Sequence, residues 1–244
     1  MPAEFFKDMH SHRSDSLHKL SLVGFILALG IIYGDIGTSP LYVMKAIVTA
    51  APVIDTNFIL GAVSCIIWTL TLQTTVKYVL ITLRADNKGE GGIFSLFALM
   101  RKRKKNLFII AIIGGSALLA DSIITPSITV VSAVEGLQMI EPNVHIILIA
   151  LIIITVLFFI QQFGTAFIGK SFGPIMFIWF STIGVLGALN MAVMPEMLKA
   201  FNPWYAIHTL IHYPSGFLLL GAVLLCTTGA EALYADLGHC GLHN

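Results

Sequence analysis

Three acidic residues lie inside long apolar stretches of the sequence, where an ionised side chain is costly. They are Asp35, Asp121 and Glu231. A carboxylate near the middle of a lipid bilayer costs about 3 kcal/mol or more, and acids that persist there bind ions, carry protons or pair with a base. The three acids are therefore the first candidates for chemistry in this chain.

Asp35 occurs where the sequence departs most from a regular apolar helix. Gly34, Gly37 and Pro40 surround it within a short stretch. Proline lacks an amide proton and glycine tolerates unwound backbone, so the pattern predicts a broken helix. A break frees carbonyl oxygens, and these can replace the hydration shell of a cation.

Side-chain oxygens beside the predicted break fit the same chemistry. The hydroxyls of Thr38 and Ser39 add neutral oxygen ligands, and Asp35 adds the compensating charge. The backbone at Gly34 is a further, secondary candidate. The alternative is a kinked structural helix in which Asp35 pairs with a lysine, and Lys45 is the only lysine that this segment offers.

Glu231 stands in a second interruption of the same kind, within residues 227–234 (TTGAEALY). Gly229 again lies next to hydroxyl side chains, including Thr228, and to an acid. Interruptions at corresponding positions of two repeats indicate the binding site of a transporter. The alternative is that Glu231 lies near the cytosolic end of its helix and is hydrated.

Asp121 precedes Thr125 by four residues, and Pro126 follows directly. Residues four apart share one face of a helix, so the Asp121 carboxylate and the Thr125 hydroxyl are predicted to lie together. We expect this face to form a wall of the ion site. The alternative is that Asp121 only makes a structural hydrogen bond.

The number of acids favours a cation as the ligand. An acid at each break would repel the carboxylate of an amino acid, and three carboxylates exceed what one monovalent ion needs. Burial and a like-charged neighbour favour the protonated form of a carboxyl group, so one acid can carry a proton. The residues thus predict a proton-coupled cation symporter, while a proton-coupled carrier of another small cation or of an amino acid stays open.

The elements that must position these acids are membrane-spanning helices. Hydrophobic residues make up 57% of the 244 and charged residues 11%, with a mean hydropathy of +0.88. This composition excludes a soluble domain and a disordered chain, and it predicts an all-α polytopic membrane protein. Six apolar segments within a transmembrane domain at 20–237 are each near the length of about 20 residues that a spanning helix needs. They are 20–48, 58–83, 107–134, 144–160, 172–193 and 216–237.

The basic residues predict the orientation. Twelve of the 14 Lys and Arg residues fall in the tail 1–19, in the region from the end of the second span to the third, and in the loop between the fourth and fifth. By the positive-inside rule, the chain is a multi-pass protein of the cell membrane with both termini, 1–19 and 238–244, in the cytoplasm. The basic run 101–105 is a topology determinant, and the net charge of +1 gives no reason to expect nucleic acid as a partner.

Other segments that could suggest a metal, phosphate or catalytic site lack the residues that such a site needs. The loop 84–92 lacks the ligands of a calcium loop and the sequence of a phosphate loop. His208 and His212 have no third ligand, and Cys65, Cys226 and Cys240 show no metal spacing. The chain has no HExxH motif and no Ser/His pair in its spans. We therefore expect neither an enzyme nor a cofactor, apart from the transported ion and protons.

Five stretches resemble the KUP/HAK/KT family of potassium uptake permeases, in the family's order and across nearly the whole chain. They are Gly30–Tyr42 (GIIYGDIGTSPLY), Arg84–Gly92 (RADNKGEGG), Ile123–Gly136 (IITPSITVVSAVEG), Gly164–Pro174 (GTAFIGKSFGP) and Gly229–Gly238 (GAEALYADLG). The first two are highly specific for this family.

The resemblance implies potassium uptake with protons, and a LeuT-like fold of the APC superfamily, built from two inverted five-helix repeats. This chain would hold the first repeat and the first helix of the second. The resemblance also implies roles in binding K+ or coupling protons for six residues. They are Asp35, Tyr42, Asp121, Thr125, Thr228 and Glu231.

The family pattern continues through about six more helices and a cytosolic domain, whereas this sequence runs only to Asn244. We therefore expect residues 238–244 to be a truncated end and the chain to be an incomplete transporter. An inactive membrane fragment or an accessory subunit is the alternative. The expected partners are the lipid bilayer and the potassium ion, and a homodimer is left open.

Overall fold

The structure is a computed structural model that describes residues 25–26, 29–30, 33–51, 54–85, 87, 90–101, 107–162, 165–213 and 216–235. Regular structure in these ranges is helical, apart from one isolated antiparallel bridge between Asn87 and Glu90. The predicted tail 1–19 and the end 238–244 lie outside the described residues, as does Cys240. The all-helical class predicted from the sequence is confirmed for the described part of the chain.

The helices follow the apolar segments closely, because a continuous apolar run in lipid must satisfy its backbone internally. In chain order they are α3 (Tyr33–Ala50), α4 (Thr56–Leu70), the π-helix η1 (Thr71–Ile81), η2 (Thr82–Arg84), α5 (Ile93–Met100), α6 (Leu107–Glu135), η3 (Gly136–Met139), α7 (Ile146–Gln161), α8 (Thr165–Val193), η4 (Pro195–Phe201), α9 (Pro203–His212), α10 (Gly216–Leu224), η5 (Leu225–Thr227) and α11 (Ala232–Ala235).

In the part of the chain that the structure describes, four helical stretches are long and apolar enough to cross a membrane. They are Thr56–Arg84, Leu107–Met139, Phe172–Val193 and Leu218–Ala235. The predicted span 144–160 corresponds to α7, which is a shorter apolar helix. The predicted span 20–48 is described continuously only from Tyr33, so six spans stay a prediction.

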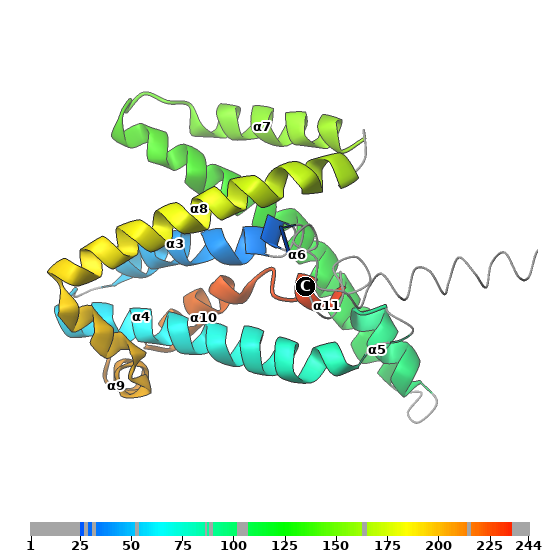
Figure 1. Ribbon diagram of the computed structural model, residues 1–244, viewed down its shortest axis with the longest axis horizontal. Helices are drawn as coiled ribbons and strands as arrows, with labels where there is room; N and C mark the ends of the chain where they lie inside the picture. Colours follow the sequence, from blue (N-terminus) through cyan, green and yellow to red (C-terminus); the bar gives the residue numbers. More distant parts are fainter. Residues whose placement is uncertain are drawn as a thin grey trace, which may run out of the picture.

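Three helices, α3, α4 and α9, contact α10, which lies between α3 and α4 (Figure 1). α4 and its π-helical extension run along one side of the molecule, and α3 with α8 runs along the other. α7 packs on α6, and α9 packs on α4. The η5 segment that follows α10 contacts α3, and α11 contacts η1.

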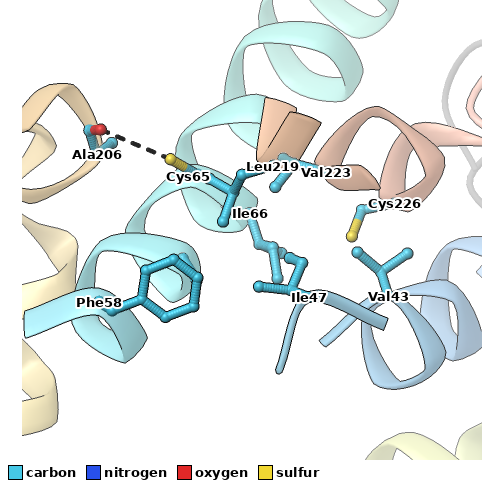
Figure 2. Packing of buried hydrophobic residues seen from close by; sticks show 10 residues of the cluster. Val43, Ile47, Phe58, Cys65, Ile66, Ala206, Leu219, Val223 and Cys226 are labelled. Atoms are coloured by element: carbon cyan, nitrogen blue, oxygen red, sulfur yellow. Dashed lines mark hydrogen bonds between the residues drawn. The ribbon is translucent and has the colours of Figure 1, made fainter. Parts of the chain in front are cut away.

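One hydrophobic core joins α3, α4, α9 and the α10–η5 segment (Figure 2). Its buried members are Val43, Ile47, Phe58, Ala62, Cys65, Ile66, Ala206, Leu219, Val223 and Cys226. Cys65 and Cys226 are free and buried in this core. The Cys65 thiol contacts the carbonyl oxygen of Ala206 at 3.7 Å.

A polar network just outside the apolar helices fixes the start of α4. Asp55 caps the helix by accepting a hydrogen bond of 2.7 Å from the Phe58 amide, and its Oδ1 also accepts one of 2.6 Å from the Tyr213 hydroxyl. Both hydrogen bonds favour the ionised carboxylate and lower the pKa of Asp55, and the bond from the Tyr213 hydroxyl has the larger effect. The same contact raises the pKa of Tyr213 to about 12, because the neighbouring carboxylate favours the protonated phenol.

The outward faces of α6, α7 and α8 are apolar and exposed. Ala150 is the one buried residue of α7, whereas Ile147 is 75% exposed and Phe158 68%. Ile123 of α6 is 73% exposed. An apolar surface of this extent is unfavourable in water and fits contact with lipid.

Candidate functional site

The break predicted around Glu231 is present. α10 passes into the short η5 helix, residues 228–231 form turns, and α11 follows. Gly229 has φ of +90°, a backbone conformation that side chains with a Cβ rarely adopt. A Cβ atom at Gly229 would lie only 2.6 Å from Cβ of Asp35. Glycine at this position thus permits both the turn and its close approach to α3.

The break predicted around Asp35 is not observed, and this expectation is wrong for the described part of the segment. α3 is helical from Tyr33 through Pro40 to Ala50. Two hydroxyls bond back to the preceding turn: Thr38 donates to the carbonyls of Gly34 and Asp35, both at 3.2 Å, and Ser39 donates to the carbonyl of Asp35 at 2.7 Å. Pro40 removes a single amide donor, and these bonds stabilise the helical turn around it.

The proposed pairing of Asp35 with Lys45 is also excluded. Lys45 forms an ion pair with Glu135 of α6, with 2.6 Å between Nζ and Oε2. Within the ranges that the structure describes, Asp35 takes part in no ion pair, and its side chain is exposed. The Asp35 carboxylate therefore faces the Gly229 turn without a neutralising lysine.

Tyr42 lies one helical turn beyond Ser39 and is linked to it. The Tyr42 hydroxyl donates to the buried Ser39 hydroxyl at 3.0 Å. Since its proton is committed to Ser39, the Tyr42 oxygen presents lone pairs to its remaining surroundings.

Asp121 and Thr125 lie together on α6 as the spacing predicts. The Thr125 hydroxyl donates to Oδ1 of Asp121 at 2.9 Å, and Thr125 is buried. α6 continues through Pro126 without a break. α3 and α6 contact each other, so Asp35 and Asp121 lie on neighbouring helices.

A polar cavity of about 210 Å³ brings part of the predicted site together. It is lined by Gln73, Lys77, Tyr78, Asp121, Thr227, Thr228 and Glu231. The carboxyl groups of Asp121 and Glu231 both line this cavity. Of the predicted residues, Asp121, Thr228 and Glu231 therefore share one cavity, whereas Asp35 and its neighbours on α3 border the adjacent turn.

The contribution of η1 was missed by sequence reasoning. Gln73, Lys77 and Tyr78 reach the cavity from this π-helix, a form that is rare and often occurs at functional sites. Thr74, in the same helix, is buried with no hydrogen-bond partner for its hydroxyl among the described residues. The signal available in the sequence was the presence of these polar residues in the second half of the otherwise apolar span 58–83.

The described residues contain no group of three or more His, Cys, Asp or Glu side chains that could hold a metal ion. Hydroxyl and carboxyl oxygens instead come from α3, α6 and the η5–α11 turn. A second cavity of about 640 Å³ lies near residues 138–151, among mostly apolar side chains, and contains none of the three acids.

Membrane-length apolar helices around an acidic, hydroxyl-lined cavity define the class as a polytopic helical membrane protein. Residues 22–244 match the family described as K+ potassium transporter integral membrane domain, and the chain belongs to this family. No solved structure matches the chain.

Curated relatives carry the name "Probable potassium transport system protein Kup". The one from Cytophaga hutchinsonii is 60% identical over 240 residues, covering 96% of this chain and 36% of the relative. Those from Flavobacterium johnsoniae and Flavobacterium psychrophilum are 57% and 56% identical over 98% and 100% of this chain, and again over 36% of the relative. The chain thus spans about a third of the length of these relatives.

Proposed function

We propose that this chain contributes the ion-binding part of a potassium uptake system that works as a proton-coupled symporter. The observation that carries the proposal is the cavity in which Asp121, Thr228 and Glu231 meet, in a member of a potassium transporter family. The relatives' printed name supports potassium as the ion. Carboxyl and hydroxyl oxygens are ligands that can replace the water of a dehydrated cation.

The proposed K+ ligands divide between two helices and one turn. Asp35 and Tyr42 act from α3, with Thr38, Ser39 and the Gly34 backbone as secondary contributors. From the other side, the ligands are Asp121, Thr125, Thr228 and Glu231. The negative charge offsets the lost hydration of the ion, and the neutral oxygens keep the binding weak enough for release.

The carboxyl pair is the proposed site of proton coupling. Two carboxyl groups that line one small cavity repel each other when both are ionised, so their proximity favours a proton on one of them. Loss of that proton would add one negative charge to the cavity and favour a cation there. Binding of K+ and occupancy of the shared proton would thus be linked in this cavity.

The proposed architecture is six spanning helices that form the first repeat and the opening helix of the second in a LeuT-like, inverted-repeat fold. The interruption at 228–231 supports this assignment, because broken helices next to an ion site are typical of such folds. In a family whose relatives are about three times longer, the remaining helices would close the site. The second candidate function is that of an inactive fragment or an accessory subunit. The oligomeric state, including a homodimer, is to be examined in the same experiments.

The proposed function predicts potassium uptake once the rest of the transporter is supplied. We expect residues 1–244, fused to the portion of the Cytophaga hutchinsonii relative beyond the matched region, to restore growth of a potassium-uptake-deficient strain at limiting potassium. Rubidium uptake by this fusion protein should be reduced by excess potassium and far less by sodium or by amino acids. Competition by an amino acid instead would contradict the choice of ion.

The proposed orientation places both termini in the cytoplasm. We expect a membrane-impermeant thiol reagent applied outside the cell to label a cysteine at Lys199 and not one at Arg103, because twelve of the 14 basic residues lie on the predicted inner side. Permeabilised cells should show labelling at both positions. Labelling of the Arg103 cysteine in intact cells would reverse the topology.

A further inference from the structure

The segment that carries Glu231 is too short to hold its own position. α11 comprises only the four residues Ala232–Ala235, and it follows the turn at Gly229. An isolated helical turn is unstable in water and depends on tertiary contacts. The position of the Glu231 carboxyl must therefore be fixed by contacts that this segment makes elsewhere.

Tyr234 provides the link between Glu231 and the rest of the protein. The Tyr234 amide donates to the Glu231 carbonyl at 3.0 Å, and the Ala235 amide donates to the same oxygen at 2.9 Å. The Tyr234 side chain is buried, and its hydroxyl donates to the carbonyl of Ala85 at 2.5 Å. Movement of Tyr234 would thus move the backbone of Glu231 with it.

Gly91 approaches the backbone of the same tyrosine. A Cβ atom at Gly91 would overlap the carbonyl oxygen of Tyr234 and would lie 2.9 Å from its carbonyl carbon. The obstacle is backbone, which cannot rotate away as the end of a flexible side chain can. Only glycine permits this close contact. Tyr234 is thus held at two points: its hydroxyl is bonded to Ala85, and its backbone packs on Gly91.

The segment around Gly91 is itself anchored. Asn87 and Glu90 exchange two backbone hydrogen bonds of 3.0 and 3.2 Å, and the Ser95 hydroxyl donates to the Glu90 carbonyl at 2.9 Å. Ser95 belongs to α5, whereas Ala85 directly follows η2. The contact with Tyr234 is therefore made by chain that is tied to helices on both sides.

We propose that Ala85, Gly91 and Tyr234 form a clamp that holds Glu231 in the cavity that Asp121 also lines, so that Gly91 and Tyr234 are positioning residues of the ion site. Their significance for transport rests on the proposed function, whereas the clamp itself does not. Opening of the clamp would release α11 and separate the carboxyl pair. The clamp thus links the chain after η2 to the cavity.

The clamp is tested first by amide hydrogen exchange of the 244-residue chain in lipid nanodiscs. Gly91→Ala should speed exchange at residues 232–235 by tenfold or more, and Tyr234→Phe should do so several-fold, while the core residues 60–66 stay protected. Gly184→Ala is the matched control, because a Cβ there meets nothing within 4 Å. Gly92→Ala tests backbone strain in the absence of a steric clash. Gly92 has φ of +90°, but a Cβ atom there would meet no atom closer than 3.7 Å. Unchanged exchange at 232–235 in both clamp variants would overturn the proposal.

The positioning role is tested by rubidium uptake through the fusion protein at several pH values. Gly91→Ala and Tyr234→Phe should raise the half-saturation concentration about tenfold and severalfold respectively and should shift the pH profile, whereas Gly184→Ala should change neither. Reduced maximal uptake with unchanged half-saturation and pH profile would overturn the positioning role. If the unmodified fusion takes up no rubidium while exchange responds as expected, the proposed function fails and the clamp stands.

Discussion

Asp35→Asn in the fusion protein is expected to reduce rubidium uptake at least a hundredfold at low external concentration. Asparagine keeps the size and one carbonyl oxygen of the side chain, so packing against the Gly229 turn is retained. The variant loses the negative charge, and among the described residues Asp35 has no lysine partner that would be left unpaired. A loss of about 3 kcal/mol in cation binding corresponds to a change of at least a hundredfold in affinity.

Uptake should be measured against rubidium concentration at two pH values and normalised to protein inserted in the membrane. Asp55→Asn is the matched control, because it makes the same chemical change outside the apolar helices and asparagine retains helix-capping ability. Its uptake should stay within about twofold of the unmodified protein. If Asp35→Asn transports with unchanged half-saturation and pH response, Asp35 is neither an ion ligand nor a proton carrier, and α3 has a structural role alone.

The helices of this protein could be predicted well because lipid leaves the chain few choices. The predicted segment 107–134 corresponds to α6 (Leu107–Glu135), and 58–83 corresponds to the helical stretch Thr56–Arg84. Continuous apolar runs determine both, since each backbone amide must bond within its own segment. The sequence also contains the spacing that joins Asp121 to Thr125, because contacts four residues apart depend on local geometry alone.

The two interruptions show where local patterns become ambiguous. Gly229 and Pro40 both predict a break, yet only the turn at Gly229 is observed. At Gly229 the backbone needs a positive φ in order to approach Asp35, which is a tertiary constraint. Around Pro40, the hydroxyls of Thr38 and Ser39 bond back to the preceding turn and the helix continues. Proline alone does not distinguish a kink from a break.

Contacts between distant segments could not be predicted from composition or periodicity. The approach of Lys77 in η1 to Glu231 joins residues far apart in the chain, and no local pattern encodes their distance. The same holds for the contact between Gly91 and Tyr234. The family resemblance includes both stretches that carry these residues, Arg84–Gly92 and Gly229–Gly238, but only the structure shows that Gly91 and Tyr234 are in contact.

Expression of residues 1–244 alone, with no further chain, is expected to give no potassium-dependent rescue of the uptake-deficient strain. The acids are only partly enclosed: Asp35 is exposed, and Asp121 and Glu231 are half-buried. A site without an opposing wall leaves these charges facing lipid or water. Alternating access also needs a second set of helices that moves against the first, and the chain spans about a third of its relatives' length.

The comparison should use the fusion protein as the positive control and membrane-inserted protein as the common scale. Growth and rubidium uptake with residues 1–244 should equal those of cells carrying an empty vector, while the fusion restores both. Rescue by the 244 residues would mean that two copies, or another chain of the cell, supply the missing wall. In that case, cross-linking in the membrane should capture a complex, and Asp35→Asn should abolish the rescue. Rescue by a species that stays monomeric would show that the helices described here are sufficient for transport, and the proposed need for an opposing set would be wrong.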